Sequence, residues 1–410
     1  MNKNSGKTLN KEMKIISVVG ARPNFMKIAP FIKAISSYNS QISINSAKLE
    51  AINSTSIQHI LVHTGQHYDD RMSKTFFEEL GIPEADINLG VGSGTHAEQV
   101  GQTMIEFEKV LKAEKPDWVV VVGDVNATLA CSVTAKKEWI KCCHIEAGLR
   151  SGDIRMPEEV NRLVTDRLSD LLLTPDKLSS ENLLKEGTSE DRIVFVGNIM
   201  IDTLESNREK ASNLDILQII EDNLYVENSF APKDKNLFRD GNIAAITLHR
   251  PSNVDEKDVL TQLVSFLLDE VCTKTPLLWP IHPRAENKLK TFGLWEKVLN
   301  THNLILLKPL GYHEMLRVNM ASQFMITDSG GLQEECTVLG TPCLTLRWNT
   351  ERPITLVEHG GASVLVGNNV EQIRKEYNIV ISKSRVPVRP PLWDGKTAER
   401  CLQAILNYGK

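Results

Sequence analysis

The sequence predicts an α/β protein made of two doubly wound domains, each a parallel sheet covered by helices. Short apolar runs rich in Val and Ile recur along most of the chain, and helical patterns separate them. Continuous apolar strands are typical of parallel sheets that are buried on both faces. The chain of 410 residues also exceeds a single core, since domains usually hold roughly 100–200 residues.

The predicted strands fall into two sets along the chain. The first set comprises Lys14–Val19, Ile57–His63, Trp118–Val122, Lys141–Ile145, Asp170–Thr174 and Ile193–Val196. The second set comprises Ile243–Leu248, Leu277–Pro280, Leu304–Lys308, Phe324–Thr327, Pro342–Leu346 and Ala362–Val366. Helical stretches such as Phe25–Ser36 and Gly331–Leu339 lie between the strands, which favours parallel βαβ units in both halves.

A long charged segment with little strand signal, Asp202–Asn242, separates the two sets. We place the domain boundary near Gly197–Asn198 and expect the Asp202–Phe230 region to be helical. The predicted N-terminal domain is therefore 14–198, and the predicted C-terminal domain is 199–389. Sheets of this class bind ligands beyond the carboxyl ends of their strands, so residues at those ends are the candidate site residues.

The two ends of the chain are predicted to differ in order. Residues 1–13 are polar and lack the apolar centre of a signal peptide, so we expect a disordered tail. The segment 390–410 contains a helical pattern at Thr397–Asn407. We expect this helix to close the chain by packing back on the first domain.

The composition argues against several classes of protein. Hydrophobic residues make up 41% and charged residues 24%, as in globular chains, and a net charge of −5 offers no basic surface for nucleic acid. No run approaches the ~18 apolar residues of a membrane span. The seven cysteines include no CxxC pair, which indicates reduced cytoplasmic thiols and neither a disulfide framework nor a zinc site.

Two local patterns resemble cofactor sites without meeting their requirements. Gly90–Gly94 is spaced like a dinucleotide fingerprint, but the next position that requires glycine is Thr95, and no acidic residue follows at the expected place. His59, His63 and His67 lie four apart, but they span a strand and its exit loop, where that spacing does not bring them together. We therefore expect no nicotinamide cofactor and no metal.

Acidic residues follow the strands of the first domain. Asp124 comes just after an apolar strand, Glu146 ends the next strand, and Glu158 opens a helix after a proline. One carboxylate at such a place is commonly a helix cap, whereas acidic clusters converging on one strand edge suggest proton transfer or stabilisation of a cation. Arg22 follows the first strand, where it either binds an anion beside a helix N-terminus or pairs with a carboxylate.

Basic residues and a glycine-rich turn follow the strands of the second domain. His249 and His282 leave two successive strands, each with an arginine close behind. Ser329 and Gly330 open a helix whose N–H groups suit a diphosphate, and Glu335 lies about a turn further along, where it suits ribose hydroxyls. Singly, each feature is also typical of a cap or a solvated surface. Jointly they predict a nucleoside-diphosphate site that faces the acidic groups across a central cleft.

Six motifs, in this order, resemble those of the non-hydrolysing UDP-N-acetylglucosamine 2-epimerases: GARPNFMKIAP, GDVNATLA, HIEAGLRS, MPEEVNR, TLHRPSN and DSGGLQEE. The match runs from about Lys14 to the closing helix. The resemblance implies two Rossmann-like domains in the glycosyltransferase-B architecture. It also implies inversion at C2 of UDP-GlcNAc to give UDP-ManNAc, by anti elimination of UDP to a 2-acetamidoglucal and syn re-addition of UDP.

The resemblance also implies roles for individual residues. The implied catalytic residues are Asp124, Glu146 and Glu158, with His249 assisting at the diphosphate or as an acid/base. The implied UDP contacts are Arg22, His282, Ser329, Gly330 and Glu335, the last on the ribose. No metal or nicotinamide is implied, the partner is a UDP-sugar substrate, and relatives of this kind are commonly homodimers.

Two departures from the family pattern leave the substrate open. Gln66–Met72 reads QHYDDRM, where many bacterial members carry Gln-His-Arg-x-Met-Leu in a regulatory site, and this variant resembles relatives that act on UDP-2,3-diacetamido-2,3-dideoxyglucuronate. The loop at His282 reads His-Pro-Arg and is shorter than in the UDP-GlcNAc enzymes. The open alternatives are an epimerase of that uronate, a hydrolysing 2-epimerase and a glycosyltransferase on the same architecture.

Overall fold

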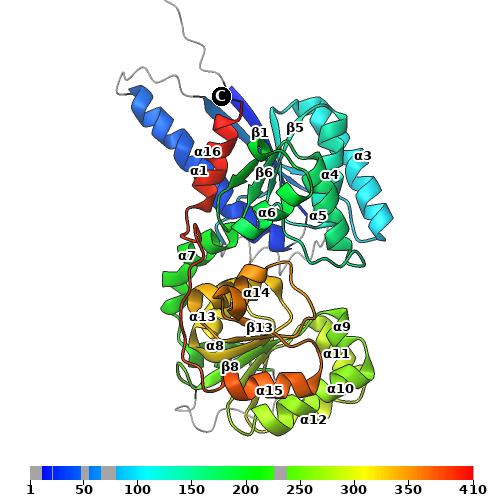
Figure 1. Cartoon of the computed structure of the whole chain (residues 1–410), viewed down its shortest axis with the longest axis vertical. Coiled ribbons are helices and arrows are strands. Elements are labelled where there is room, and N and C mark those ends of the chain that lie inside the picture. The colour runs from blue at the N-terminus through cyan, green and yellow to red at the C-terminus, as the bar shows by residue number, and fades with distance from the viewer. Residues whose placement is uncertain (1–11, 21, 48–54, 66–79, 226–237, 410) are drawn as a thin grey trace, which may run out of the picture. The chain divides into compact units, whose positions relative to one another are not determined.

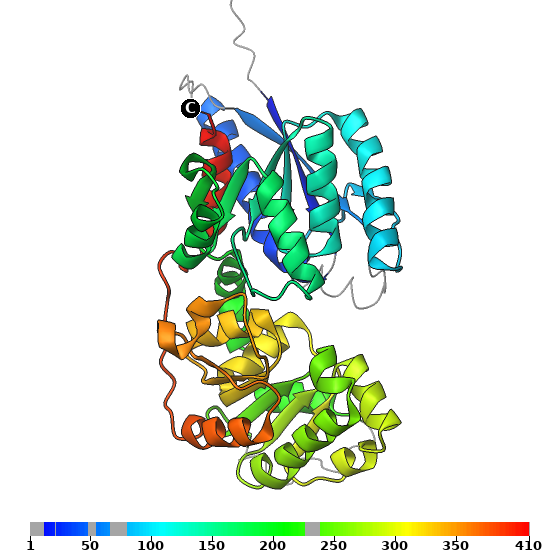
Figure 2. The same ribbon diagram turned by 45° about the vertical axis from the view of Figure 1, so that its right-hand side comes forward.

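The computed structural model describes residues 12–20, 22–47, 55–65, 80–225 and 238–409 (Figure 1). These residues form two compact units. The first unit contains the described parts of Met1–Leu149, Asp153–Thr203 and Gly395–Lys410. The second unit contains Arg150–Gly152 and the described part of Leu204–Asp394. The colours of Figure 2 follow the chain through the elements of each unit.

Over its described residues, the first unit has a seven-stranded parallel sheet. The strands are β1 (Glu12–Val19), β2 (Ser56–His63), β3 (Ile87–Asn88), β4 (Trp118–Val122), β5 (Lys141–Ile145), β6 (Leu171–Thr174) and β7 (Ile193–Phe195). Their order is β3-β2-β1-β4-β5-β6-β7, so the chain winds outward first in one direction and then in the other. The direction reverses between β1 and β4, where sheets of this class bind ligands.

Helices cover both faces of this sheet. They are α1 (Arg22–Ala47), α3 (His96–Glu114), α4 (Asn126–Lys137), α5 (Pro157–Leu168), α6 (Lys177–Lys185) and α16 (Thr397–Asn407), while α7 (Ile199–Ser212) runs from the first unit into the second. On one face Val119 and Val121 of β4 pack with Phe107, Leu111 and Cys131. All residues of β4 are buried, which explains its unbroken apolar sequence.

The closing helix α16 belongs to the first unit, where it packs against α1. Asp202 of α7 stabilises the first turn of α16. Its two carboxylate oxygens accept hydrogen bonds from the backbone N–H groups of Thr397 at 3.0 Å and Ala398 at 2.7 Å. The Nε of Arg400 donates to the carbonyl of Val196 at 2.6 Å. The C-terminal segment thus completes the first unit after the chain has built the second.

The second unit has a six-stranded parallel sheet over its described residues, in the order β10-β9-β8-β11-β12-β13. The strands are β8 (Ile243–Thr247), β9 (Leu277–Pro280), β10 (Leu304–Leu307), β11 (Ser322–Thr327), β12 (Cys343–Thr345) and β13 (Ser363–Leu365). The helices are α8 (Ile216–Asn223), α9 (Pro251–Val254), α10 (Lys257–Phe266), α11 (Pro283–Thr291), α12 (Trp295–Leu299), α13 (Tyr312–Ala321), α14 (Gly330–Leu339) and α15 (Val370–Val380).

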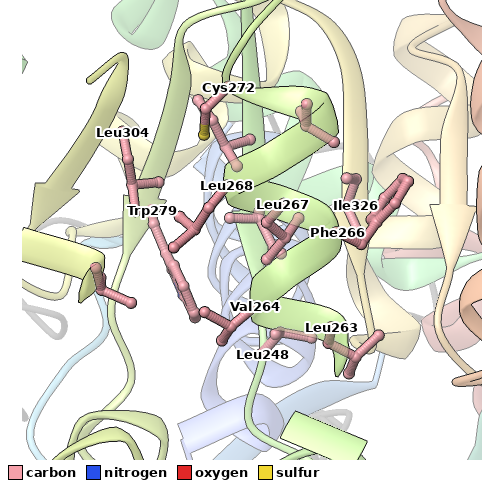
Figure 3. Packing of buried hydrophobic residues seen from close by; sticks show 14 of the residues in the cluster. Leu248, Leu263, Val264, Phe266, Leu267, Leu268, Cys272, Trp279, Leu304 and Ile326 are labelled. Carbon is pink, nitrogen blue, oxygen red and sulfur yellow. The ribbon is translucent and has the colours of Figure 1, made fainter. Parts of the chain in front are cut away.

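Alternate residues of these strands serve two separate cores. In β9, Leu277 and Trp279 point into one cluster, and Leu278 between them points into the other. Figure 3 shows the first cluster, in which Trp279 and Phe266 are among the buried side chains. This alternation follows from the period of two in a strand, and it explains why both sets of positions are apolar.

The predicted fold class is confirmed, since both units are doubly wound α/β structures. Each predicted strand is present, with ends within two residues of those predicted. The strand β3 was not predicted, because two residues carry no periodicity of their own. The expected tail was wrong for Glu12 and Met13, which belong to β1. The rest of that tail, residues 1–11, lies outside the described residues.

The helical predictions differ mainly in length. Helix α1 spans Arg22–Ala47 and so extends beyond the predicted Phe25–Ser36 at both ends. The region Asp202–Phe230 holds most of α7 and all of α8, and residues 226–230 lie outside the described residues. The predicted helix Thr397–Asn407 has the bounds of α16.

Candidate active site

Two predicted carboxylates lie at the ends of neighbouring strands in the first unit. Strands β4 and β5 pair in parallel with Val122 opposite Ile145, so Asp124 and Glu146 leave the same edge of the sheet. The turn after β4 is held against β5, because the N–H of Gly123 donates to the carbonyl of Ile145 at 3.1 Å. The sheet topology therefore brings these two acidic residues to one place, as the sequence predicts.

Glu146 occupies an unusual position for a carboxylate. Its backbone φ is 72°, a left-handed conformation that costs a non-glycine residue about 1–3 kcal/mol and is often found at functional sites. Its side chain is buried, and its Oε2 forms an ion pair with the Nζ of Lys27. Within the part of the chain that the structure describes, its Oε1 has no hydrogen-bond partner. Lys27 thus holds one carboxylate oxygen of Glu146, and the other oxygen can still accept a hydrogen bond or a proton.

Lys27 is a site residue that the sequence analysis missed as such. It lies in the second turn of α1, and its side chain is 8% exposed. Asn24, three residues earlier on the same helix face, donates from Nδ2 to the carbonyl of Val122 at 2.8 Å and fixes the helix against β4. A Cβ on Gly123 would lie 3.1 Å from the Nζ of Lys27, so glycine leaves room for the ammonium group. The spacing of Asn24 and Lys27 after the first strand was the available signal.

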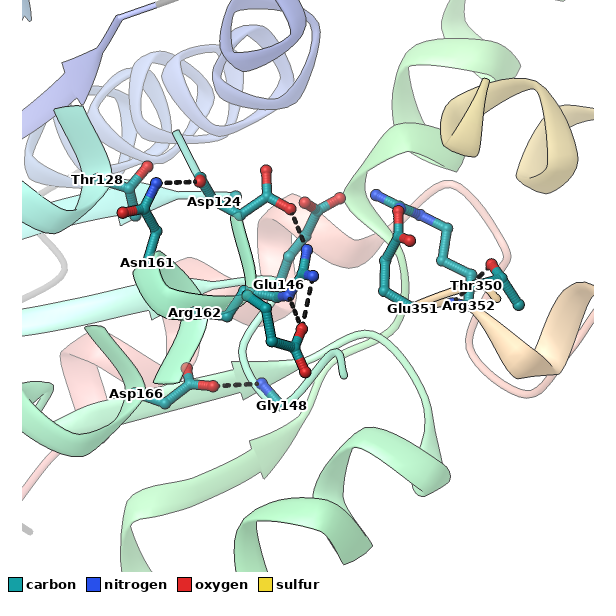
Figure 4. Close-up of polar contacts among 12 residues, drawn as sticks. Asp124, Thr128, Glu146, Gly148, Asn161, Arg162, Asp166, Thr350, Glu351 and Arg352 are labelled. Atoms are coloured by element: carbon teal, nitrogen blue, oxygen red, sulfur yellow. Dashed lines mark hydrogen bonds and ion pairs between the residues drawn. The ribbon is translucent and has the colours of Figure 1, made fainter. Parts of the chain in front are cut away.

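Asp124 is bound by an arginine from α5 (Figure 4). The guanidinium group of Arg162 pairs with Asp124 Oδ2 and also donates from Nε to Glu159 Oε2 at 3.0 Å. The side chain of Asp124 remains 23% exposed, whereas that of Arg162 is 2% exposed. Arg162 Nη2 donates to the same Glu159 Oε2 at 2.6 Å. Arg162 therefore keeps Asp124 in place while one face of its carboxylate stays open.

Of the two adjacent glutamates that open α5, the structure turns Glu159 inward and leaves Glu158 exposed. Glu159 is buried against Arg162. Glu158, one of the predicted catalytic residues, has no hydrogen-bond or ion-pair partner among the described residues. The unit by itself therefore does not bring Glu158 into the Asp124–Arg162 pair.

A buried histidine links the two turns that carry the carboxylates. His144 of β5 contacts Asp166 Oδ1 through Nδ1 at 2.6 Å and donates from Nε2 to the carbonyl of Gly123 at 2.8 Å. Asp166 Oδ2 accepts from the N–H of Gly148 at 3.0 Å, a contact drawn in Figure 4. Gly123 precedes Asp124, and Gly148 follows Glu146 by two residues. The His144–Asp166 pair therefore fixes the spacing of the two turns.

Three further predicted residues follow adjacent strands of the second unit. His249, His282 and Ser329 come after β8, β9 and β11, which are neighbours in the sheet. The ring centroids of His249 and His282 lie 5.7 Å apart. The Nδ1 of His282 accepts a hydrogen bond from the N–H of Arg284 at 3.1 Å and so caps α11. The prediction that these residues share one sheet edge agrees with this topology.

Ser329 and Gly330 lie at the N-terminus of α14. Ser329 is the N-cap, its side chain makes no capping hydrogen bond, and both residues are half-buried. The first N–H groups of a helix have no partner within the helix, so this terminus favours an anion. A Cβ on Gly330 would lie 2.8 Å from Arg352 Nη1 and 2.9 Å from Glu351 Oε1, so the turn needs glycine.

The arginines after β12 are neutralised by buried glutamates. Arg347 Nη2 donates to Glu351 Oε2 at 2.6 Å, and Arg352 Nε donates to Glu334 Oε1 at 2.7 Å. Arg352 also pairs with Glu351. These four charges are buried and balanced, and Figure 4 labels Glu351 and Arg352 among them. Their pairing supports the turn at Gly330 and does not add a net positive charge.

Glu335 and Arg22 complete the set of predicted residues. Glu335 is buried in α14, and burial raises its pKa to about 7, while the polar groups of Tyr312 and Asn319 on α13 oppose that rise. Arg22 is the first residue of α1. The variant stretch Gln66–Met72 lies outside the described residues.

Some further features bear on the class of site. All seven cysteines are free and buried. Among the described residues no group of three or more His, Cys, Asp or Glu side chains has a geometry suited to a metal ion. In the described part of the chain, no helix combines the length and the apolarity needed to cross a membrane.

Comparison with known proteins identifies the family. A sequence model of the UDP-N-acetylglucosamine 2-epimerase family matches residues 50–406. The UDP-N-acetylglucosamine 2-epimerase of Methanocaldococcus jannaschii is 40% identical over 400 residues, which cover 97% of this chain and 100% of the relative. The UDP-2,3-diacetamido-2,3-dideoxy-D-glucuronate 2-epimerase of Pseudomonas aeruginosa is 38% identical over 357 residues, with 87% and 88% covered.

The solved structures give the same result. The crystal structure of the M. jannaschii UDP-GlcNAc 2-epimerase in complex with UDP-GlcNAc and UDP matches with a TM-score of 0.81 at 39% identity, and the match covers 97% of this chain and 100% of that one. Both the family model and these relatives span most of the chain. The chain therefore belongs to the UDP-N-acetylglucosamine 2-epimerase family.

Proposed function

We propose that this protein is a non-hydrolysing epimerase that inverts C2 of UDP-GlcNAc to give UDP-ManNAc. Family membership supports an epimerase, and the M. jannaschii relative was solved with UDP-GlcNAc and UDP. The observation that carries the proposal is the pair of carboxylates on adjacent strand ends, where Glu146 keeps an unpartnered Oε1 and Asp124 an open face.

In the first half of the proposed reaction, the bond between C1 and the UDP oxygen breaks, and its electron pair leaves with UDP. Positive charge then develops at C1 and the ring oxygen. A carboxylate takes the proton from C2, and the electrons of that C–H bond form the double bond of a 2-acetamidoglucal. Departure of UDP must lead, because the C2 proton is weakly acidic. Asp124 and Glu146 supply the negative charge that stabilises the cation and the group that exchanges the proton.

In the second half, UDP adds back to C1, and a protonated group on the opposite face of the ring delivers a proton to C2. UDP must stay bound in the meantime, and we assign its diphosphate to the helix terminus at Ser329 and Gly330 with His249 and His282. We assign Arg22 to the same anion and Glu335 to the ribose. Glu158 is the third carboxylate we assign to the sugar. The two steps are redox-neutral, so they need no hydride acceptor.

The test is incubation with UDP-GlcNAc in heavy water, followed by NMR at C2. The expected result is deuterium at C2 of a sugar that still carries UDP, together with UDP-ManNAc. The Asp124→Asn and Glu146→Gln variants should lose this exchange, since the amide cannot take a proton or balance the cation. Wild-type protein that neither exchanges C2 nor forms UDP-ManNAc would contradict the proposal.

A second candidate substrate is UDP-2,3-diacetamido-2,3-dideoxyglucuronate. It is favoured by the 38% identity to the P. aeruginosa 2-epimerase of that uronate. The same NMR assay with both substrates gives two values of kcat/KM, and the higher value identifies the substrate. Release of free sugar would instead indicate a hydrolysing epimerase, and sugar transfer to an added acceptor would indicate a glycosyltransferase.

A further inference from the structure

Asp328, at the end of β11, is a fully buried carboxylate whose oxygens are surrounded by donors. Its Oδ2 accepts from the backbone N–H of His249 at 3.0 Å and of Arg250 at 2.8 Å, and from Asn253 Nδ2 at 3.1 Å. Burial alone would raise the pKa of Asp328, but the ring of His249 and these backbone donors outweigh it and hold the pKa below its ordinary value. Asp328 is therefore ionised at neutral pH and can only accept hydrogen bonds.

The remaining oxygen of Asp328 accepts from the backbone N–H of His249 at 3.2 Å and also faces the imidazole of that residue. The distance from His249 Nδ1 to Asp328 Oδ1 is 2.7 Å, and the His249 side chain is 40% exposed. Because an ionised carboxylate has no proton to give, the proton in this bond sits on Nδ1. A neutral imidazole carries one N–H, so Nε2 then holds the lone pair. Nδ1 is occupied by Asp328, which leaves Nε2 for a ligand.

The neighbouring histidine has the opposite arrangement. His282 Nδ1 accepts from the backbone N–H of Arg284, so in its neutral form His282 carries its proton on Nε2. Two imidazoles with centroids 5.7 Å apart thus hold complementary tautomers, one fixed by a carboxylate and the other by a helix N–H. His282 therefore serves as the comparison for His249 in an experiment that detects which ring nitrogen is protonated.

We propose that Asp328 is a positioning residue that fixes His249 in the Nδ1-protonated form, so that Nε2 is the atom that meets the substrate and exchanges a proton. The effect on turnover rests on the proposed epimerase function, whereas the tautomer itself does not. In either protonation state of the ring Nδ1 keeps its proton, and only Nε2 gains or loses one. Asp328 thereby decides which nitrogen acts without touching the substrate.

The direct test is NMR of full-length protein labelled with ¹⁵N in its histidine rings. The ¹⁵N shift distinguishes a protonated ring nitrogen from one with a lone pair, and the His249→Asn and His282→Asn variants assign the two signals. At a pH where both rings are neutral, we expect His249 protonated on Nδ1 and His282 protonated on Nε2. A spectrum with His249 protonated on Nε2 would overturn the inference.

The Asp328→Asn variant tests the consequence. Its amide oxygen can still accept from the N–H of Arg250 and from Asn253, while its NH₂ group replaces the oxygen that faces the ring. The amide then donates to His249 Nδ1 and forces the proton to Nε2. We expect this switch in the NMR spectrum and a fall in kcat of about 100-fold or more.

The matched control is Asp240→Asn, which removes the charge of an exposed aspartate that pairs with Arg317 in the same unit. It should leave the His249 spectrum and kcat unchanged. If the wild-type protein turns over a UDP-sugar and Asp328→Asn is equally active, the inference is wrong and the proposed function is unaffected. If the wild-type protein is inactive on both UDP-sugars, the proposed function is wrong, and the NMR spectrum still tests the tautomer of His249.

Discussion

Lys27 and Glu146 form a buried ion pair that joins the second turn of α1 to the end of β5 across 119 positions of sequence. Their side chains are 8% and 2% exposed, so each charge depends on the other for compensation. The pair fixes one carboxylate oxygen of Glu146 and leaves the second without a partner among the described residues. The anchoring of this carboxylate is thus a property of the tertiary fold.

Replacing Lys27 with Met should destabilise the protein strongly. The variant leaves the Glu146 carboxylate buried and uncompensated, which costs about 3–5 kcal/mol of unfolding free energy, measured by urea denaturation. The double variant Lys27→Met with Glu146→Gln should recover much of this loss, because no charge is left buried. Lys33→Met, on an exposed face of the same helix, is the control and should change little. A single variant as stable as that control would contradict the role given to the pair.

Gly330→Ala should disturb the turn at the start of α14. The new Cβ would lie within 3.0 Å of Arg352 Nη1 and Glu351 Oε1, and both groups are held by buried ion pairs. We expect a loss of about 1–3 kcal/mol in unfolding free energy and weaker UDP binding by calorimetry. Gly101→Ala, in α3 with no atom within 4 Å of the added Cβ, should instead keep or gain stability. Equal effects of the two substitutions would argue against this packing.

Substitutions of the adjacent glutamates of α5, Glu158 and Glu159, should have different effects on stability and on activity. Glu159→Gln weakens the buried contact with Arg162 and should lower the unfolding free energy by about 1–3 kcal/mol. Glu158→Gln should leave stability unchanged, because Glu158 is exposed, and it should slow deuterium exchange at C2 if Glu158 acts on the sugar. The measurements are urea denaturation and the NMR exchange assay on both variants. An unstable Glu158→Gln variant would show that the inward and outward assignments are reversed.

Glu335 should make stability depend on pH. Burial raises its pKa to about 7 in the folded protein, against 4.5 for the ordinary carboxyl. Between these values the folded state binds more protons than the unfolded state, so the unfolding free energy falls as pH rises from about 4.5 to 7. The fall attributable to this group is up to about 3 kcal/mol and is complete above pH 7.

The Glu335→Gln variant isolates this effect. The difference in unfolding free energy between the variant and wild type should grow in favour of the variant as pH rises through that window, and it should be constant below pH 4. Urea denaturation at a series of pH values measures it. Parallel pH profiles for the two proteins would show that Glu335 is charged in both states.

The sequence by itself determined the fold class and which strand ends carry the candidate site residues. The run WVVVV has the bounds of β4, since Asp117 before it and Gly123 after it do not continue the apolar sequence of a buried strand. Asp124 and Glu146 each follow a predicted strand, and parallel strands end at one edge of a sheet. Their common place at that edge could therefore be predicted. The amphipathic pattern of Thr397–Asn407 likewise gave the bounds of α16. These features depend on residues close together in the sequence, and the spacing of apolar residues there can be recognised without a structure.

Only the tertiary structure decided how those side chains are held. That Glu159 turns inward and Glu158 outward depends on where Arg162 lies, and both glutamates look alike in the motif MPEEVNR. That Lys27 reaches Glu146, and that Asp328 takes Nδ1 of His249, depends on residues far apart in sequence. The energy of a buried charge is set by the partner that packing brings within a few ångströms. Distant partners leave no periodic trace in the chain, so these contacts had to be read from the fold.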